Sequence, residues 1–278
     1  MEEKIAIITG ANSGIGKATA IGLAKKGIHI IMMCRSQARG QEALKEVIKQ
    51  SGGKVTLILG DLADLTSVKQ FSESFKQQFS RLDILVNNAG VISKKRQETK
   101  DGFELQFGVN HLGHFLLTHL LLPLICATPN SRIINVSSMA YRFGKLDFND
   151  LAMEKSYSSA ASYSRSKLCN VLFTKELANR LKGTSTTTNS LHPGAVATNI
   201  LASNNPVRQK FPWIESIAKT PEKGAETSIY LAISEEVSNI SGAYFSNCKM
   251  KKTTTRSNDP RLAQELWTIS EQLIGDYL

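Results

Sequence analysis

The chain has 278 residues, of which 41% are hydrophobic and 21% are charged. This composition is close to the average of globular proteins and excludes both a disordered and a fibrous chain. Lysine and arginine exceed aspartate and glutamate by ten, a surplus that can attract nucleic acid, anionic lipid or a phosphorylated cofactor. Because the basic residues are spread along the chain, we expect an ordinary solvated surface and no nucleic-acid partner, and we interpret the short run Lys249–Lys252 in the same way.

A chain of this length can bury one large core, so residues 1–278 are expected to form a single domain. The first residues, MEEKIAIITG, contain no basic leader and no cleavable apolar segment. The apolar stretch Phe115–Ile125 is interrupted by polar residues and by Pro123, and it is shorter than the roughly 20 apolar residues of a membrane-spanning helix. We therefore expect a cytoplasmic protein without a membrane span, while peripheral contact with a membrane and homo-oligomerisation stay open.

The cysteines are far apart in the sequence and form no C-x-x-C pair. They are Cys34, Cys126, Cys169 and Cys248. This spacing suits neither a zinc site nor a disulfide framework, so free thiols in a reducing compartment are expected.

Short apolar runs alternate with segments of helical length. In chain order, strands are expected at residues 5–9, 28–33, 54–59 and 82–86, at Arg132–Val136 and Ser185–His192, and near Ala243–Ser246. Between them, helices are expected at Ile15–Lys26, Ala38–Gln50, Leu65–Phe79, about Gly102–Cys126, Ala160–Lys182 and Pro221–Ile233. The strand runs are almost continuously apolar, except for the polar run at 184–191, as in parallel strands covered by helices on both faces. The pattern predicts an α/β fold: a doubly wound, mostly parallel sheet of about seven strands.

One segment interrupts this alternation. Residues 199–220 hold large apolar side chains and two prolines between predicted elements. Two interpretations stay open: a substrate loop or lid, and a packed helical excursion. Trp213, with Phe211 and Ile214, is accordingly interpreted as core packing, a substrate wall or a membrane-touching patch.

A glycine-rich turn follows the first strand directly, and a helix begins within it. The turn reads Thr9, Gly10, Ala11, Asn12, Ser13, Gly14, Ile15 and Gly16. Such a turn directs unpaired backbone N–H groups and the positive end of the helix dipole toward a pyrophosphate. The glycine spacing differs from that of a Walker A loop. The context therefore predicts a Rossmann-type dinucleotide site.

The end of the second predicted strand indicates which dinucleotide is bound. NAD-binding folds carry a carboxylate there, which accepts hydrogen bonds from the ribose 2′-hydroxyl. This chain has Arg35 instead. A guanidinium pairs with a 2′-phosphate, and Lys17 could add a second positive charge, so NADP(H) is favoured over NAD(H).

Tyr163 and Lys167 lie four residues apart in a segment patterned as a helix, and therefore share one face. A phenol has a pKa near 10, and a neighbouring ammonium is expected to lower that pKa toward the range that suits proton transfer. Ser137 and Ser138 follow the apolar run RIINV, at the end of a strand where such sheets bind ligands. These residues predict a proton-transfer site beside the dinucleotide.

The motifs TGANSGIG, NNAG, NHLG, NVSS, YSRSK and HPG occur in this order over nearly the whole chain. Together they resemble the short-chain dehydrogenase/reductase family. Two longer sequence stretches are similar to the retinol dehydrogenase-like branch of that family, namely DGFELQFGVNHLGHFLLTHLLLPLI and INVSSMAYRFGKLDFNDL. Animal members of that branch often carry an N-terminal membrane anchor, whereas this chain begins at its first predicted strand.

The resemblance implies a role for individual residues. Tyr163 would be the acid/base, Lys167 its partner and a ligand of the nicotinamide ribose, Ser138 the group that binds the substrate oxygen, and Asn110 the anchor of a water in a proton relay. Asp61 and Leu62 would contact the adenine; Asn88, Ala89 and Gly90 would line the cofactor; Pro193 and Thr198 would lie at the nicotinamide end. The implied activity is hydride transfer between NADP(H) and a hydrophobic alcohol, aldehyde or ketone. The alternative is an NADP(H)-binding sensor or scaffold without turnover.

His111, His114 and His119 have helical spacings that could place them on one face. No cysteine or carboxylate is near them in the sequence, and a metal site requires a complete set of ligands. We therefore expect them to pack inside a helix and expect no metal.

Overall fold

The computed structural model describes residues 3–194 and 219–278. The described chain forms an eight-stranded sheet of order β3-β2-β1-β4-β5-β6-β7-β8. The strands are β1 (Ile5–Thr9), β2 (His29–Cys34), β3 (Val55–Leu59), β4 (Ile84–Asn87), β5 (Arg132–Val136), β6 (Thr187–His192), β7 (Tyr244–Ser246) and β8 (Lys249–Met250). The first seven pair in parallel, and only β8 pairs antiparallel, with β7. The predicted doubly wound, mostly parallel sheet is confirmed, with one strand more than expected.

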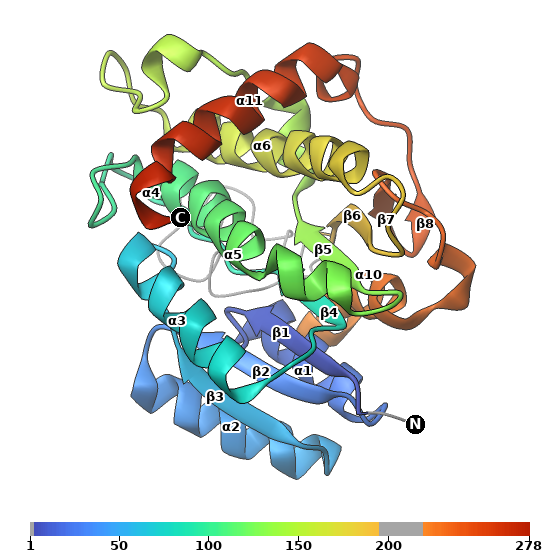
Figure 1. Cartoon of the computed structure of the whole chain (residues 1–278). Helices are drawn as coiled ribbons and strands as arrows, with labels where there is room; N and C mark the ends of the chain where they lie inside the picture. Colours follow the sequence, from blue (N-terminus) through green and yellow to red (C-terminus); the bar gives the residue numbers. More distant parts are fainter. Residues whose placement is uncertain (1–2, 195–218) are drawn as a thin grey trace.

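Helices cover both faces of this sheet (Figure 1). They are α1 (Gly14–Ala24), α2 (Gln37–Ser51), α3 (Leu65–Gln78), α4 (Leu105–Phe107), α5 (Gly113–Ala127), α6 (Ser159–Arg180), α10 (Pro221–Ile233) and α11 (Pro260–Leu273). The short helical segments are η1 (Gly108–Leu112), which is a π-helix, and the 3-10 turns η2 (Met139–Phe143), η3 (Phe148–Asp150), η4 (Glu235–Val237), η5 (Arg256–Asn258) and η6 (Gly275–Tyr277). The bounds of the predicted elements agree with these to within a few residues.

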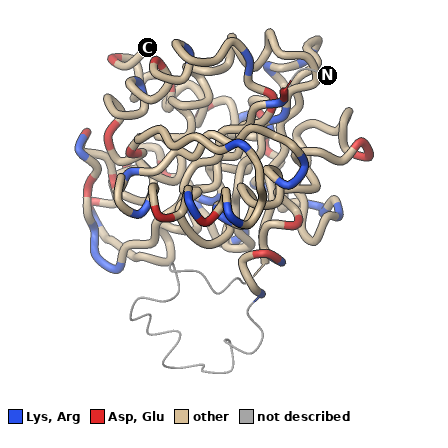
Figure 2. Tube along the Cα trace, turned by 90° about the horizontal axis from the view of Figure 1, so that it is seen from below, with Lys and Arg blue, Asp and Glu red and all other residues tan. Residues whose placement is uncertain are grey.

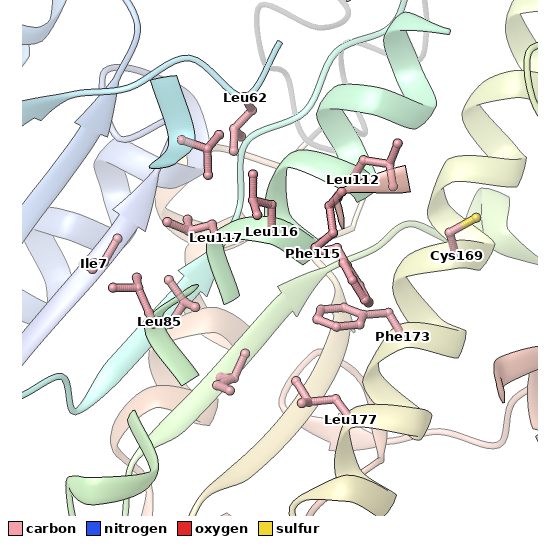
Figure 3. Packing of buried hydrophobic residues seen from close by; sticks show 14 of the residues in the cluster. Ile7, Leu62, Leu85, Leu112, Phe115, Leu116, Leu117, Cys169, Phe173 and Leu177 are labelled. Carbon is pink, nitrogen blue, oxygen red and sulfur yellow. The ribbon is translucent and has the colours of Figure 1, made fainter. Parts of the chain in front are cut away.

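Alternate residues of each strand enter two separate cores, because successive side chains of a strand point to opposite faces of the sheet. Ile5 and Ile7 of β1 pack with α3, α5, α6 and α11, whereas Ala6 and Ile8 pack with α1, α2 and α10. Figure 3 shows the first core from close by, where Phe115 of α5 and Phe173 of α6 face one another at 5.4 Å between ring centroids. The strands β1 and β2 therefore carry apolar residues at almost every position, as the sequence indicates.

The polar strand β6 is central in the sheet, and its polar side chains have buried partners. Asn135 of β5 donates to Thr188 of β6 at 3.3 Å and to Thr174 of α6 at 3.0 Å. Asn189 donates to the carbonyl of Ile240 at 2.6 Å. These hydrogen bonds offset the desolvation of polar groups, which explains why a polar run forms a buried strand.

The predicted long helix after Gly102 is divided in the structure. It begins at Leu105, and a π-helical turn at Gly108–Leu112 precedes α5. The whole stretch, Leu105–Ala127, is by length and composition the one helix of the described residues that could cross a membrane, with a mean hydropathy of 1.4. The sequence analysis considered only its apolar part from Phe115. Because 67% of its most apolar window is buried inside the protein, we interpret it as a core helix.

Two elements were not predicted, namely β8 and α11. Helix α11 lies along α6 (Figure 1), and its Trp267 stacks on Phe173 at 5.8 Å between ring centroids. Figure 2 shows lysine and arginine interspersed with aspartate and glutamate over the described chain, as expected for a solvated surface. All four cysteines are free, as predicted.

Candidate active site

A cavity of about 650 Å³ opens at the carboxyl ends of the parallel strands. It lies where the strand order reverses, between β1 and β4, which is the position at which doubly wound sheets bind their ligands. Its walls come from the turn after β1, the ends of β2 to β6, and α6. Most of the predicted site residues line it: Gly10, Asn12, Ser13, Gly14, Ile15, Gly16, Arg35, Asp61, Leu62, Asn88, Ala89, Gly90, Ser138, Tyr163, Lys167 and Pro193.

The glycine turn forms one end of the cavity and has no room for a side chain at Gly16. Gly10 and Gly14 have φ angles of 66° and 54°, in the left-handed region that favours glycine. A Cβ on Gly16 would come within 2.5 Å of both the Nδ2 of Asn88 and the carbonyl oxygen of Gly10. Ser13 precedes α1 without capping it through its side chain, so the first N–H groups of that helix stay free for an anion. The turn therefore fits a pyrophosphate.

Two arginines line the cavity beyond the turn. Arg35 follows β2, and Arg39 lies in the first turn of α2. Ser36 also lines the cavity and caps α2, its hydroxyl accepting the N–H of Arg39 at 3.4 Å. The sequence analysis missed Arg39, although its position one turn after Arg35 was a usable signal.

Lys17 is not brought to the cavity. It does not line the walls, and its Nζ pairs with Glu46 of α2 at 2.6 Å. The expected position of Lys17 at the cavity is therefore wrong, and the second arginine that lines the cavity with Arg35 is Arg39.

The loop after β4 is held against the turn by one hydroxyl. The Oγ1 of Thr9 accepts the backbone N–H groups of Asn88 and Ala89, both at 2.9 Å. The side chain of Asn88 in turn donates to the carbonyl of Thr9 at 2.8 Å. These bonds fix residues 88–90 as the floor of the cavity.

Tyr163, Lys167 and Ser138 meet at the opposite end. Ser138 lies two residues after the end of β5 and caps η2, and its hydroxyl lowers the pKa of Tyr163, which places the two side chains close together. One turn along α6, the Nζ of Lys167 lies 5.7 Å from the centroid of the Tyr163 ring and donates to the carbonyl of Val136 at 3.1 Å. The structure therefore brings together the three side chains that the sequence selected.

The pKa of Tyr163 differs from the expectation. Burial raises its pKa, and the hydrogen bond with Ser138 opposes this only in part. The ammonium of Lys167 lies over the aromatic ring, and burial lowers the pKa of Lys167 itself to about 8. The net shift of the phenol pKa is therefore upward, opposite to the expected lowering, because burial is its largest cause.

Asn110 lies behind the cavity wall, in the π-helical turn, and is fully buried. Its side chain accepts the N–H of Val91 at 2.8 Å and donates to the carbonyl of Val91 at 3.1 Å. It also donates to the hydroxyl of Ser166 at 3.0 Å, between Tyr163 and Lys167 in the sequence. Asn110 thus joins the loop after β4 to the helix that carries Tyr163.

A buried ion pair secures the same helix. Glu104 accepts the N–H groups of Gln106 and Phe107, the hydroxyl of Ser162 at 2.8 Å and the guanidinium of Arg165 at 3.4 Å. The side chains of Glu104 and Arg165 are 0% and 4% exposed, so each charge depends on the other. This pair fixes the rotation of α6 about its axis, and with it the direction of Tyr163.

The remaining predictions concern the histidines and the segment that contains Thr198 and Trp213. Of the three histidines expected to pack inside a helix, His111 and His114 are buried as predicted, whereas His119 of α5 is only half-buried. Thr198 and the aromatic residues near Trp213 lie outside the described residues, as does the segment 199–220 apart from Lys219 and Thr220.

The family model described as short chain dehydrogenase matches residues 4–209. The chain therefore belongs to the short-chain dehydrogenase/reductase family of nucleotide-binding oxidoreductases. Within that family it is retinol dehydrogenase-like. It is 47% identical to retinol dehydrogenase 14 of Mus musculus over 292 residues, which cover 99% of this chain and 87% of that protein. It is 42% identical to retinol dehydrogenase 11 of Mus musculus over 273 residues, covering 98% and 86%.

Solved structures agree with this assignment. An uncharacterised protein from Mycobacterium Paratuberculosis superimposes with a TM-score of 0.80 at 34% identity, covering 98% of this chain and 93% of that one. An NAD(P)-dependent gluconate 5-dehydrogenase from Beutenbergia cavernae with bound NADP has a TM-score of 0.71 at 26% identity, covering 88% and 94%.

Proposed function

We propose that this chain is an NADP(H)-dependent enzyme that interconverts a hydrophobic alcohol and its aldehyde or ketone. One observation carries the proposal: Tyr163, Lys167 and Ser138 line the same cavity as the glycine turn. A protein that only bound the dinucleotide would have no chemical need for a phenol, an ammonium and a serine hydroxyl at the far end of its cavity.

The coenzyme would be held along the cavity by residues that already line it. The turn at 10–16 suits the pyrophosphate, Asp61 and Leu62 the adenine, and Pro193 the nicotinamide end. Arg35 and Arg39, with the N-terminus of α2 beside them, suit a 2′-phosphate, since a guanidinium forms charge-assisted hydrogen bonds with phosphate oxygens. This arrangement supports NADP(H) over NAD(H).

When bound, the nicotinamide supplies a hydride to the carbonyl carbon in reduction, or accepts one from the alcohol in oxidation. In reduction, Tyr163 donates its proton to the substrate oxygen, and Ser138 holds that oxygen beside the phenol. Because burial raises the pKa of Tyr163, the phenol keeps its proton at neutral pH and is available as the acid.

Lys167 and Asn110 support this step. The ammonium of Lys167 stabilises the phenolate that remains after proton donation, by attraction between opposite charges. The side chain of Asn110 bonds both Val91 and Ser166, and Asn110 would anchor the relay water that the family resemblance implies.

Apolar side chains surround the catalytic end. Val91, Ile92, Val109 and Met139 line the cavity there, and Met139 is 56% exposed at its surface. A wall of this kind binds an apolar body, while Ser138 and Tyr163 bind its single oxygen. The relatives named as retinol dehydrogenases are consistent with a small hydrophobic substrate.

The test is a panel of hydrophobic aldehydes and ketones, with consumption of NADPH and of NADH followed by absorbance. We expect NADPH to be consumed faster, and Tyr163→Phe to lower kcat by roughly 10²–10⁴-fold, the usual contribution of general acid catalysis. Tyr157→Phe is the matched control, because the hydroxyl of Tyr157 bonds Gln106 and Ser93 away from the cavity. Near wild-type turnover by Tyr163→Phe would contradict the assignment of Tyr163 as the acid. Binding of NADPH without turnover of any substrate would favour the alternative function, an NADP(H)-binding sensor or scaffold.

A further inference from the structure

His114 joins the coenzyme loop to Asn110 through both nitrogens of its ring. It lies in α5 and is 2% exposed. Its Nε2 is 2.8 Å from the hydroxyl of Thr9, and its Nδ1 is 3.2 Å from the backbone carbonyl of Asn110. Burial lowers the pKa of His114 to about 3, so the ring is neutral and carries one proton.

The two partners decide where that proton sits. A carbonyl oxygen can only accept, so Nδ1 must carry the hydrogen that it donates to Asn110. Nε2 is then an acceptor, and the hydroxyl of Thr9 must donate to it. One tautomer satisfies both contacts, and the protonated ring would satisfy only one of them.

On the coenzyme side, this arrangement fixes the direction of the Thr9 hydroxyl. That oxygen already accepts two N–H groups, from Asn88 and Ala89, and has a single hydrogen to donate. The alternative acceptor, the carbonyl of Val86, is 3.4 Å away against 2.8 Å for His114. His114 therefore keeps both lone pairs of Thr9 aimed at the loop that forms the cavity floor.

On the catalytic side, the contact reaches the π-helical turn. The side chain of Asn110 donates to Ser166, and Ser166 donates to the carbonyl of Tyr163 at 2.8 Å. Thr9 at the glycine turn is thus connected to the backbone of Tyr163 through His114, the backbone and side chain of Asn110, and Ser166.

We propose that His114 is a positioning residue that couples the coenzyme loop at residues 88–90 to Asn110 and the helix of Tyr163. The inference rests on the proposed function for its consequences in binding and turnover. The part of the inference that concerns the ordering of residues 88–90 applies to the coenzyme-free protein as well.

Two conservative variants separate the two contacts. An asparagine amide can take the place of Nδ1 but does not reach Thr9, whereas a glutamine amide reaches the position of Nε2 but vacates that of Nδ1. In His114→Asn we expect faster hydrogen exchange at the Ala89 amide and an NADPH dissociation constant raised about tenfold, as for one lost buried hydrogen bond. In His114→Gln we expect the dissociation constant to stay within about twofold and kcat to fall about tenfold.

His111 provides the matched control. It is 1% exposed in the same helical stretch, and burial likewise lowers its pKa to about 3. Its Nε2 bonds Ser270 of α11, and its ring makes no hydrogen bond with Thr9 or with the carbonyl of Asn110. His111→Asn should lower the melting temperature while leaving the exchange of the Ala89 amide and the affinity for NADPH unchanged.

The outcomes distinguish the two proposals. If wild-type protein binds NADPH and His114→Asn matches it in affinity and in Ala89 exchange, the role of His114 is overturned. If wild-type protein binds neither NADPH nor NADH, the proposed function fails, and the exchange rates of the coenzyme-free proteins still decide the role of His114. If His114→Asn does not fold, His114→Gln provides the test. Faster hydrogen exchange at the Ala89 amide in His114→Gln would then overturn the assignment of the two contacts.

Discussion

The ammonium of Lys167 lies over the ring of Tyr163, with 5.7 Å between Nζ and the ring centroid, and donates to the carbonyl of Val136 at 3.1 Å. The same environment acts on the two groups in opposite ways. Burial raises the pKa of the phenol and lowers that of the ammonium to about 8, because it disfavours the charged form of each. At neutral pH the pair is therefore a neutral acid beside a cation.

The pH dependence of reduction should report Lys167. As the pH rises through about 8, Lys167 loses its proton and no longer stabilises the phenolate of Tyr163. We expect kcat/KM for a carbonyl substrate to fall above that pH, whereas Tyr163 stays protonated there. In Lys167→Arg the guanidinium stays charged, and the decline should disappear even if the overall rate is lower. A wild-type profile that stays flat between about pH 7 and about pH 10 would exclude this role of Lys167.

Coenzyme preference should depend on Arg35 and Arg39. Hydrogen bonds to charged groups contribute about 1.5–3 kcal/mol, so replacing either arginine by alanine should raise the KM for NADPH by roughly 10- to 100-fold. The KM for NADH, which has no 2′-phosphate, should change by less than about twofold. Lys49→Ala, at an exposed position of the same helix, is the control for a general loss of positive charge. Equal effects on both coenzymes would contradict the assignment.

Gly16→Ala should weaken dinucleotide binding. Its Cβ would lie 2.5 Å from the carbonyl oxygen of Gly10, and this backbone cannot move without reshaping the turn. Gly22→Ala, in the same helix, is the comparison, because its Cβ would meet only the side chain of Ile229, outside the cavity. Titration of both variants with NADPH, followed by fluorescence, should show a loss of affinity in the first alone.

The buried histidines should make the protein sensitive to acid. Burial lowers the pKa of both His111 and His114 from 6.5 to about 3, so the unfolded chain binds more protons than the folded chain between these values. The stability that they contribute is complete above about pH 6.5 and is lost progressively as the pH falls toward about 3. Between pH 7 and pH 5.5, each should lower the free energy of unfolding by about 1 kcal/mol. Urea unfolding of wild type and His111→Phe at both pH values measures this. The variant should lose about 1 kcal/mol of the pH dependence and keep the part contributed by His29, His114 and His192, whose pKa values are also lowered.

Much of the site follows from short-range sequence rules. Tyr163 and Lys167 share a helix face by their spacing, and Ser138 meets them because it follows the carboxyl end of a strand in a parallel sheet. The glycine turn is similarly fixed by the strand before it and the helix after it. These predictions needed only the periodicity of helices and strands.

Other features depend on contacts between distant segments. The packing of α1 on α2 decides whether Lys17 points to the cavity or to Glu46. The local sequence around Lys17 does not indicate this packing. The pKa of Tyr163 depends on burial by the whole fold, so its direction could not be obtained from the spacing of Lys167. By contrast, α11 had a usable signal that was overlooked: Asp259 as the capping residue, followed by Pro260 at the first helical position.

The π-helical turn at Gly108–Leu112 gives the stretch before α5 a hydrogen bond from the N–H of Gly113 to the carbonyl of Gly108, five residues back instead of four. This one extra residue sets the direction in which every later side chain of the helix points around the helix axis. Without it, later side chains would swing by about 100° around the helix axis. Thr118, which now accepts a hydrogen bond from Asn87 at 3.0 Å, would turn away from the sheet. A one-residue deletion in this turn should therefore be far more disruptive than a substitution at the same place, since it misaligns an entire helix with the strands beneath it.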